Sequence, residues 1–315
     1  MTGYLARRAL QAIVVMLIVS VIVFVLLHSL PGGLVRAQLG PKASRFAVFQ
    51  LERTEGLLKP LPLQYLIWLA NLVKGNLGFS YYMNQPVASL LGHYLPRTLL
   101  LVGVSTLFTV AVAVPMGMWQ GFRRNRIDDH LLSASMLILY AMPGFLLGVI
   151  GIILLSLDVP VLPSTATAFG SGLGTDVTVL VLPIATLFLG NISYYSRYMR
   201  SAVIDNLLED YVRTAYAIGN PARRVLLRHV LRNSLSSTVT MLGLTLPYVF
   251  SGALIVEELF NFPGIGLLFW NASQTRDYPV LLGVVLVVTA AVVAGSLLAD
   301  VGYAALDPRV RYVRR

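Results

Sequence analysis

The chain has 315 residues, of which 57% are hydrophobic and only 12% are charged, whereas ordinary globular proteins carry roughly 25% charged residues. So much apolar surface cannot be hidden inside one soluble globule, so the composition excludes a soluble protein and predicts one that resides in membrane lipid. The formal net charge of +10 does not indicate a nucleic-acid partner, because the basic residues form short clusters between apolar runs, as the positive-inside rule of membrane proteins predicts.

Cysteine is absent from the sequence, which excludes disulfides, thiolate metal sites and cysteine nucleophiles.

Six uncharged stretches are long enough to cross a membrane as helices, which takes about 20 apolar residues. We therefore expect an all-α polytopic membrane protein with six transmembrane helices. The first stretch is not expected to be a cleaved signal peptide, because its apolar core is followed by His-Ser-Leu-Pro-Gly-Gly, without an A-x-A-like cleavage site. The stretches are 9–35, 98–122, 131–157, 177–196, 233–256 and 278–299, the last expected to continue as a helix to 304.

The segments between the spans are set apart by their composition. The piece 159–175 is uncharged, but Pro160, Pro163 and three glycines among serines and threonines predict a loop. Residues 36–97 include Trp68 and other aromatic residues, so we expect a small extracytoplasmic cap of short helices. The predicted division of the chain is the N-terminus and first span at 1–35, the cap at 36–97, the transmembrane core at 98–304 and a cytoplasmic tail at 305–315.

The distribution of lysine and arginine predicts the orientation. Sixteen of the 24 such residues fall in the N-terminus, the 123–130 loop, the 197–232 loop and the C-terminal tail. Seven of the other eight fall in the 36–97 segment, which is long enough for the positive-inside rule to give them little weight. Both termini and the 197–232 loop are therefore expected on the cytoplasmic side.

The inner loop begins as an extension of the fourth span. Residues 198–208 are expected to continue that helix into the cytoplasm, with Arg200, Asp205 and Glu209 on its solvent-exposed side.

A second, shorter helix is expected to follow over residues 210–219. Gly219 closes it, since glycine suits a left-handed helix stop. Asn220 as an N-cap and Pro221 as a first helical residue then begin a strongly basic helix that leads into the fifth span. The loop is either an exposed docking element or a basic loop that simply obeys the charge rule, and its residues alone leave both interpretations open.

The inner loop resembles that of a known family. Arg213-Thr-Ala-x-Ala-x-Gly219, followed by Arg223-Arg-Val-Leu-x-Arg-His-x-Leu-Arg-Asn233, is similar to the inner loop of peptide-type ABC importer permeases, the dipeptide, oligopeptide and nickel permeases of bacteria. Further segments fit the type in chain order: Tyr4-Leu-x-Arg-Arg8, Leu30-Pro-Gly-Gly33, Gly75-Asn-Leu-Gly-x-Ser80, Gln85-Pro-Val87, Pro96-Arg-Thr98, Val256-Glu-Glu-Leu-Phe-Asn-Phe-Pro-Gly-Ile-Gly266, Arg276-Asp-Tyr-Pro-Val280 and Leu306-Asp-Pro-Arg-Val310.

One departure from the family pattern concerns the tip of the loop. The family usually has Arg-Thr-Ala-Arg-Ala-Lys-Gly, whereas Tyr216 and Ile218 replace the two basic residues here. The resemblance therefore implies a less basic and more apolar tip, which is expected to dock differently on its partner.

The resemblance implies a permease subunit of an ABC importer in the bacterial plasma (inner) membrane, forming half of a translocation pathway for di- or oligopeptides. The implied partners are a second homologous permease subunit, two cytoplasmic ATPase subunits and an extracytoplasmic substrate-binding protein. The chain would not be an enzyme by itself and would hold no cofactor, metal or catalytic residue, since ATP hydrolysis resides in the partner subunits. The ATPase-coupling loop would comprise Tyr211, Arg213, Thr214, Ala215, Tyr216, Ala217, Ile218 and Gly219.

The residues themselves bear on the source of energy. The sequence has no G-x-x-x-x-G-K-[ST] phosphate loop and no lysine after Lys74. An ion-coupled carrier or channel is the alternative, but it would be expected to bury ionisable groups at mid-membrane, and Glu257, Glu258 and Asp300 lie near span ends. The two glutamates mark either the outer mouth of the pathway or solvated helix-end charges.

An intramembrane enzyme is a further alternative. The four histidines (His28, His93, His130 and His229) are scattered and share no metal-ligand spacing. Some polar span residues line a cavity or else bond between helices, namely Asn191, Ser193, Thr245 and Ser251; prolines that could kink spans are Pro115, Pro143, Pro183 and Pro247.

Overall fold

The computed structural model describes residues 2–29, 35, 43–54 and 56–306. The predicted Leu30-Pro-Gly-Gly exit and nearly all of the C-terminal tail lie outside the described residues. The chain forms two compact units. Unit 1 comprises Met1–Thr98 with Pro263–Val293, and unit 2 comprises Leu99–Phe262 with Ala294–Arg315.

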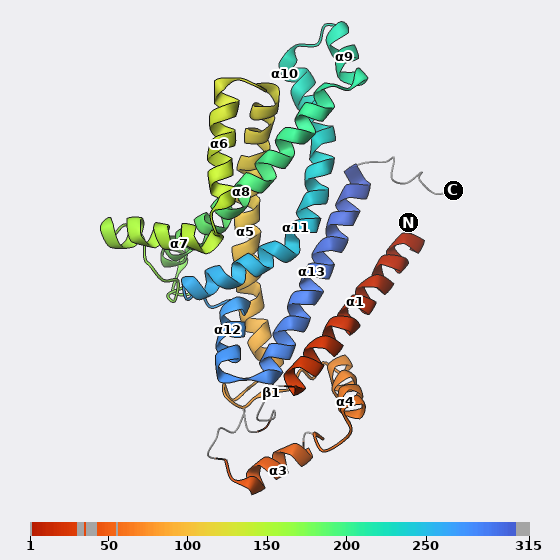
Figure 1. Cartoon of the computed structure of the whole chain (residues 1–315), viewed down its shortest axis with the longest axis vertical. Helices are drawn as coiled ribbons and strands as arrows, with labels where there is room; N and C mark the ends of the chain where they lie inside the picture. The colour runs from red at the N-terminus through yellow and green to blue at the C-terminus, as the bar shows by residue number, and fades with distance from the viewer. Residues whose placement is uncertain (1, 30–34, 36–42, 55, 307–315) are drawn as a thin grey trace. The chain divides into compact units, whose positions relative to one another are not determined.

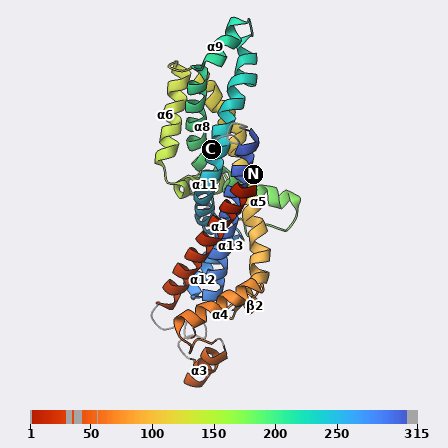
Figure 2. The same cartoon turned by 90° about the vertical axis from the view of Figure 1, so that its right-hand side faces the viewer.

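Unit 1 contains the N-terminal helix and the predicted cap segment (Figures 1 and 2). Its core joins apolar residues of three helices, among them Leu90, Leu268 and Val284. The short helices expected in the cap are present, and a β-hairpin of two antiparallel strands, each of two residues, follows them without having been indicated by the sequence. The elements are α1 (Thr2–His28), α3 (Arg45–Thr54), α4 (Leu61–Val73), β1 (Phe79–Ser80), β2 (Gln85–Pro86), the first part of α5 (Val87–Phe122), α12 (Ile265–Thr275) and the first part of α13 (Tyr278–Leu306).

A buried hydrogen bond ties the hairpin of unit 1 to the junction of α12 and α13. The Ser80 hydroxyl donates to the Asp277 carboxylate, and both residues are almost completely buried. Burial raises the pKa of the Asp277 carboxyl above its ordinary value, although the Ser80 hydrogen bond acts in the opposite direction.

Unit 2 holds the rest of the helices. Figures 1 and 2 show α6 and α11 each lying beside α8. Phe260 and Phe262 are fully buried in its core, and the Phe260 carbonyl accepts a hydrogen bond from Ala166 N–H at 2.7 Å. Besides the second parts of α5 and α13, the elements are α6 (Ile127–Ala141), α7 (Gly144–Ile152), the π-helical η1 (Ile153–Asp158), α8 (Leu173–Leu207), α9 (Asp210–Ala217), α10 (Ala222–Arg224), the π-helical η2 (Val225–Val230) and α11 (Leu231–Leu259).

Among the described residues, three helices are long and apolar enough to cross a membrane, and a bent pair would make a fourth. The three are Val87–Phe122, Leu173–Leu207 and Tyr278–Leu297. Helices also occupy the predicted first and fifth spans, as α1 and α11. The six-span topology itself stays a prediction.

The bent pair occupies the predicted third span, which is not one continuous helix. α6 and the α7–η1 segment meet at an angle of 96°. Met142 is extended (φ −84°, ψ 131°) and Pro143 precedes the first residue of α7. A residue before proline is pushed out of the helical region, and proline has no N–H to donate. Pro143 thus acts as the anticipated break.

Other boundaries also differ from expectation. α5 begins at Val87, not at 98, because Val87 and Leu91 pack against Gly283, where a Cβ would lie 2.6 Å from a Val87 methyl. The predicted 159–175 loop is irregular until α8 begins at Leu173. The interpretation of two solvated helix-end glutamates is wrong for Glu257, which is fully buried, while Glu258 is exposed.

Candidate functional site

The predicted coupling loop folds as the short helix α9 between two long helices. α8 is continuous through the predicted fourth span and its inner extension to Leu207. Glu209 is extended (φ −71°, ψ 146°) and precedes α9, which runs from Asp210 to Ala217. From Ala222 the chain is helical through α10, η2 and α11 to Leu259. Figure 1 shows α9 and α10 together at one end of unit 2, in the segment that connects α8 to α11.

Gly219 ends α9 in the predicted left-handed conformation, with φ +84°. Its N–H donates to the Tyr216 carbonyl at 2.9 Å, and the Asn220 N–H donates to the Ala215 carbonyl at 3.3 Å. These two bonds form a Schellman stop, which satisfies carbonyls that a helix end otherwise leaves without partners. The short helix is therefore closed by backbone bonds and does not fray into the next segment.

The prediction that Asn220 caps the following helix is wrong. Its side-chain amide donates backward to the Ala215 carbonyl at 3.1 Å, so it completes the end of α9. Pro221 (φ −68°, ψ 148°) is the residue that precedes α10, without a side-chain cap. The fixed φ of proline suits that place, and its missing N–H would have had no partner in the first turn.

The inward face of α9 is anchored in an apolar cluster. Val212 and Ala215 are 2% and 4% exposed and pack with Met199 and Val203 of α8 and with Val225 of η2. Burying a valine side chain contributes about 1.5–3 kcal/mol. Val212 was missing from the predicted site, although its spacing of three residues from Ala215 is the signal of a shared helix face.

Hydrogen bonds add a second attachment of α9. The Tyr211 hydroxyl donates to Asn206 Oδ1 at 2.6 Å, and Asn206 Nδ2 donates to the Ala202 carbonyl at 2.8 Å and to Ser234 Oγ at 3.3 Å. The chain of bonds connects α9 to α8 and to the buried Ser234 of α11. α9 is thus held by both of the long helices between which it lies.

The predicted site residues fall on two faces of α9 and its end. Tyr211 is half-buried and Ala215 is buried, while the remaining six are exposed: Arg213, Thr214, Tyr216, Ala217, Ile218 and Gly219. Ile218 is 74% exposed and Tyr216 is 41% exposed. Arg213 Nη1 lies 3.4 Å from Asp210 Oδ1, but both side chains are largely exposed. This ion pair therefore adds little stability. The outward face is therefore free of the chain's own core.

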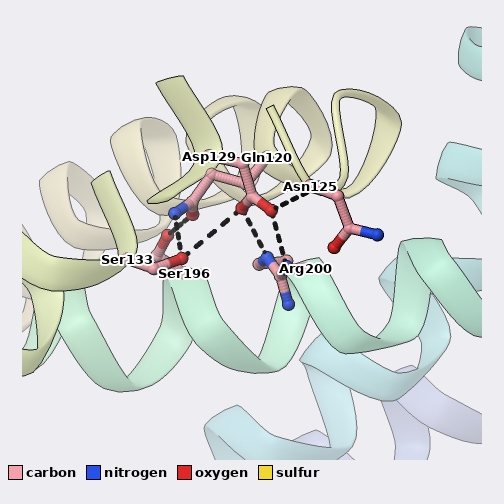
Figure 3. Close-up of polar contacts among 6 residues, drawn as sticks. All are labelled: Gln120, Asn125, Asp129, Ser133, Ser196 and Arg200. Atoms are coloured by element: carbon pink, nitrogen blue, oxygen red, sulfur yellow. Dashed lines mark hydrogen bonds and ion pairs between the residues drawn. The ribbon is translucent and has the colours of Figure 1, made fainter. Parts of the chain in front are cut away.

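An ion pair with a buried aspartate and a partly exposed arginine lies near the same end of α8 (Figure 3). Arg200 Nε and Nη2 each donate to one carboxylate oxygen of Asp129 in α6 at 2.7 Å. The Asp129 side chain is 1% exposed and that of Arg200 is 28% exposed. Arg200 is therefore only partly exposed to solvent, because it pairs with Asp129, whereas Asp205 and Glu209 are exposed as expected. Within the described ranges, no group of three or more His, Cys, Asp or Glu residues is placed to hold a metal ion.

Two family models match the chain almost from end to end. Residues 113–312 match the family described as binding-protein-dependent transport system inner membrane component, and residues 1–102 match the N-terminal family of the same membrane components. The chain belongs to this family. It is therefore a multi-pass permease of the inner membrane.

Individual relatives agree with the family. The permease is 35% identical over 319 residues to the oligopeptide transport system permease protein AppB of Bacillus subtilis, with 99% of this chain and 100% of AppB covered. It is 34% identical over 313 residues to the glutathione transport system permease protein GsiC of Escherichia coli O6:H1, with 99% and 100% covered. Both relatives are named as permease proteins and not as enzymes.

A solved structure shares the fold. The permease matches a chain from the inward-facing conformations of the MetNI methionine ABC transporter with a TM-score of 0.56, over 69% of this chain and 96% of that chain. The sequence identity is 18%, so the likeness shows an ABC permease fold and says nothing about cargo.

Proposed function

We propose that this permease is one half of the membrane channel of an ABC importer for peptides, with six spans and both termini in the cytoplasm. Its partners are a second, homologous permease subunit, two cytoplasmic ATPase subunits and an extracytoplasmic substrate-binding protein. The family and the permease relatives support this assembly. The names of the relatives, an oligopeptide and a glutathione permease, support short peptides as the cargo class.

The single observation that carries the proposal is the construction of α9. A loop that passes motion from an ATPase to the spans must be rigid, because a flexible tether transmits no displacement. α9 has a buried face, a hydrogen-bonded stop and two continuous helices on either side. A basic loop that merely obeyed the charge rule would require none of these features. We infer that α9 is the coupling helix and that ATP hydrolysis in the partner subunits drives transport through it.

The exposed face of α9 defines how the ATPase would be recognised. Tyr216 and Ile218 stand at the positions where the resembling loops carry basic residues, and both are exposed here. Ile218 is an exposed apolar side chain at the end of the proposed coupling helix itself, where it can enter a pocket of the partner. The ATPase groove for this permease is therefore expected to be apolar where Ile218 enters, with polar contacts around Arg213 and Thr214.

A charge at position 218 tests this docking. The tagged chain is co-expressed with its second permease subunit and its ATPases, solubilised in mild detergent and purified through the tag. For Ile218→Asp we expect the ATPase retained per permease to fall about tenfold or more, because a buried interface anchor is replaced by a charge that must be desolvated.

The matched control is Ile127→Asp. Ile127 is 78% exposed against 74% for Ile218, and it is the first residue of α6, outside the predicted coupling loop. This variant is expected to retain the ATPases like the unmodified chain. If the unmodified permease co-purified with no ATPase, or if Ile218→Asp retained it fully while importing peptide, α9 would not be the coupling helix.

A further inference from the structure

We propose that the Asp129–Arg200 ion pair is a positioning element of the transport cycle, which makes α6 and α5 move together with α8 when α9 is displaced. The inference rests on the proposed function, because it assumes that α9 receives motion from an ATPase. It assigns a role to two residues that lie outside the coupling helix itself. The following contacts all belong to unit 2.

The Asp129 carboxylate is fully engaged. Besides the two hydrogen bonds from Arg200, its Oδ2 accepts the Asn125 N–H at 3.1 Å and its Oδ1 accepts the Ser133 hydroxyl at 3.4 Å. Asn125 is in the left-handed conformation, with φ 65°, in the turn before α6. One buried carboxylate therefore bonds to the turn before α6 through Asn125, to α6 itself through Ser133 and to α8 through Arg200. Two-point binding by a planar guanidinium fixes direction as well as distance.

A second contact brings α5 into the same assembly. The Ser196 hydroxyl of α8 donates to Gln120 Oε1 at 2.9 Å, and Gln120 Nε2 donates to Ser133 Oγ of α6 at 3.4 Å. Figure 3 shows these residues adjoining the ion pair. α5 also approaches α8 closely, since a Cβ at Gly121 would lie 2.6 Å from a Val203 methyl. The three helices are thus joined at one level.

The coupling helix is attached to α8 at that same level. Val212 and Ala215 of α9 pack against Met199 and Val203, which lie in the turn of α8 that also carries Arg200. A displacement of α9 therefore reaches α8 where the ion pair connects it to α6 and where glycine contacts connect it to α5. Without the ion pair, α8 could shift or rotate while α6 stayed behind, and nucleotide hydrolysis would continue with less transport.

The neighbouring aspartate provides a matched control. Asp128 pairs with Arg123 at 3.0 Å and accepts the Trp119 indole N–H at 3.0 Å. The Asp128 side chain is 31% exposed and its partners lie at the end of α5 and in the adjoining turn, so it makes no bond to α8 in the described part of the chain. Asp128→Asn and Asp129→Asn make the same chemical change at adjacent positions, but only the second removes a charge that binds α8.

The experiment measures peptide imported per ATP hydrolysed. The complete transporter, with both permease subunits, the ATPases and the binding protein, is reconstituted in proteoliposomes with a radiolabelled dipeptide. For Asp129→Asn we expect this ratio to fall about 2- to 30-fold, while the ATPase content of the purified complex is unchanged. For Asp128→Asn the ratio is expected to stay at the unmodified value.

A second variant covers the case in which Asp129→Asn does not assemble. Arg200→Lys keeps the charge but loses the two-point geometry, and it is expected to lower the same ratio. If the ion pair had a purely structural role, its loss would reduce thermal stability and yield, but the complexes that did assemble would import as much peptide per ATP hydrolysed as the unmodified transporter. That result in either variant overturns the inference. An equal fall for Asp128→Asn also overturns it. Failure of the proposed function is distinguishable, because the unmodified chain would then bind no ATPase.

Discussion

At the scale of single residues, the backbone conformation of Gly219 determines where α9 ends. It combines φ +84° with open space, since a Cβ added there would meet no atom within 4 Å. Replacement therefore strains the backbone without creating a clash. The Schellman stop of α9 depends on this one left-handed residue.

Gly219→Ala is expected to destabilise the end of α9 by about 1–2 kcal/mol, the cost of a left-handed conformation for an ordinary residue. Gly219→Asn should cost less, because asparagine tolerates that region better. Hydrogen exchange of the α9 amides measures the local opening free energy. The control is Gly92→Ala in α5, which has helical geometry and no atom within 4 Å of the added Cβ. Equal exchange in Gly219→Ala and the unmodified chain would contradict the prediction.

Two adjacent aspartates illustrate what residue type leaves undecided. Asp128 and Asp129 have the same chemistry in a basic loop, yet the first has a side chain 31% exposed and the second 1%. Sequence could not separate them, because the burial of Asp129 comes from α8, 71 residues further along the chain. Their sequence separation from Arg200 does not indicate which of the two aspartates pairs with it.

At the scale of elements, helix contacts in unit 2 depend on small residues. At Gly117 of α5, an added Cβ would lie 2.7 Å from the Met199 Cβ and 2.7 Å from the Ser196 carbonyl oxygen of α8. The backbones approach so closely that only glycine fits. Membrane helices associate through such small-residue contacts, because lipid supplies no hydrophobic driving force between them.

Gly117→Ala is therefore expected to destabilise the permease by about 1–3 kcal/mol through overpacking, seen as a lower unfolding temperature in detergent. Gly103→Ala lies in the same helix and meets no atom within 4 Å, so it should be neutral or slightly stabilising. If the two alanine variants unfolded at the same temperature, α5 and α8 would not be in the described contact.

At the scale of the whole molecule, the proposed topology has a direct test. The chain has no cysteine, so single cysteines can be introduced as reporters without background. Ser171 lies in the exposed loop before α8, on the side predicted to be extracytoplasmic, and Arg124 lies in the predicted inner loop before α6.

A membrane-impermeant maleimide should label Ser171→Cys in intact spheroplasts and leave Arg124→Cys unlabelled until the membrane is permeabilised. The physical reason is the excess of arginine on the side of Arg124, which the positive-inside rule retains in the cytoplasm. Labelling of both cysteines, or of Arg124→Cys alone, in intact spheroplasts would show that the predicted orientation is wrong.

Much of the element pattern was predictable because it depends on local chemistry. In the described part of the chain, helices lie within each of the six predicted spans, and Pro143 breaks the third because proline interrupts helix. Misses occurred where distant segments intervene. α5 starts early because Val87 packs against Gly283, and Asn220 turns back to Ala215. The six-span count and the orientation remain predictions.

By itself, the sequence determined that this is an apolar helical membrane protein with a helix, stop and helix in its inner loop, because hydropathy, proline and glycine act through neighbouring residues. Only the tertiary structure decided which faces are used. Val212 and Ala215 turn inward and Ile218 turns outward, and Asp129 is buried against Arg200. Burial and ion pairing depend on which helices meet, and that is fixed by packing across long separations in the chain.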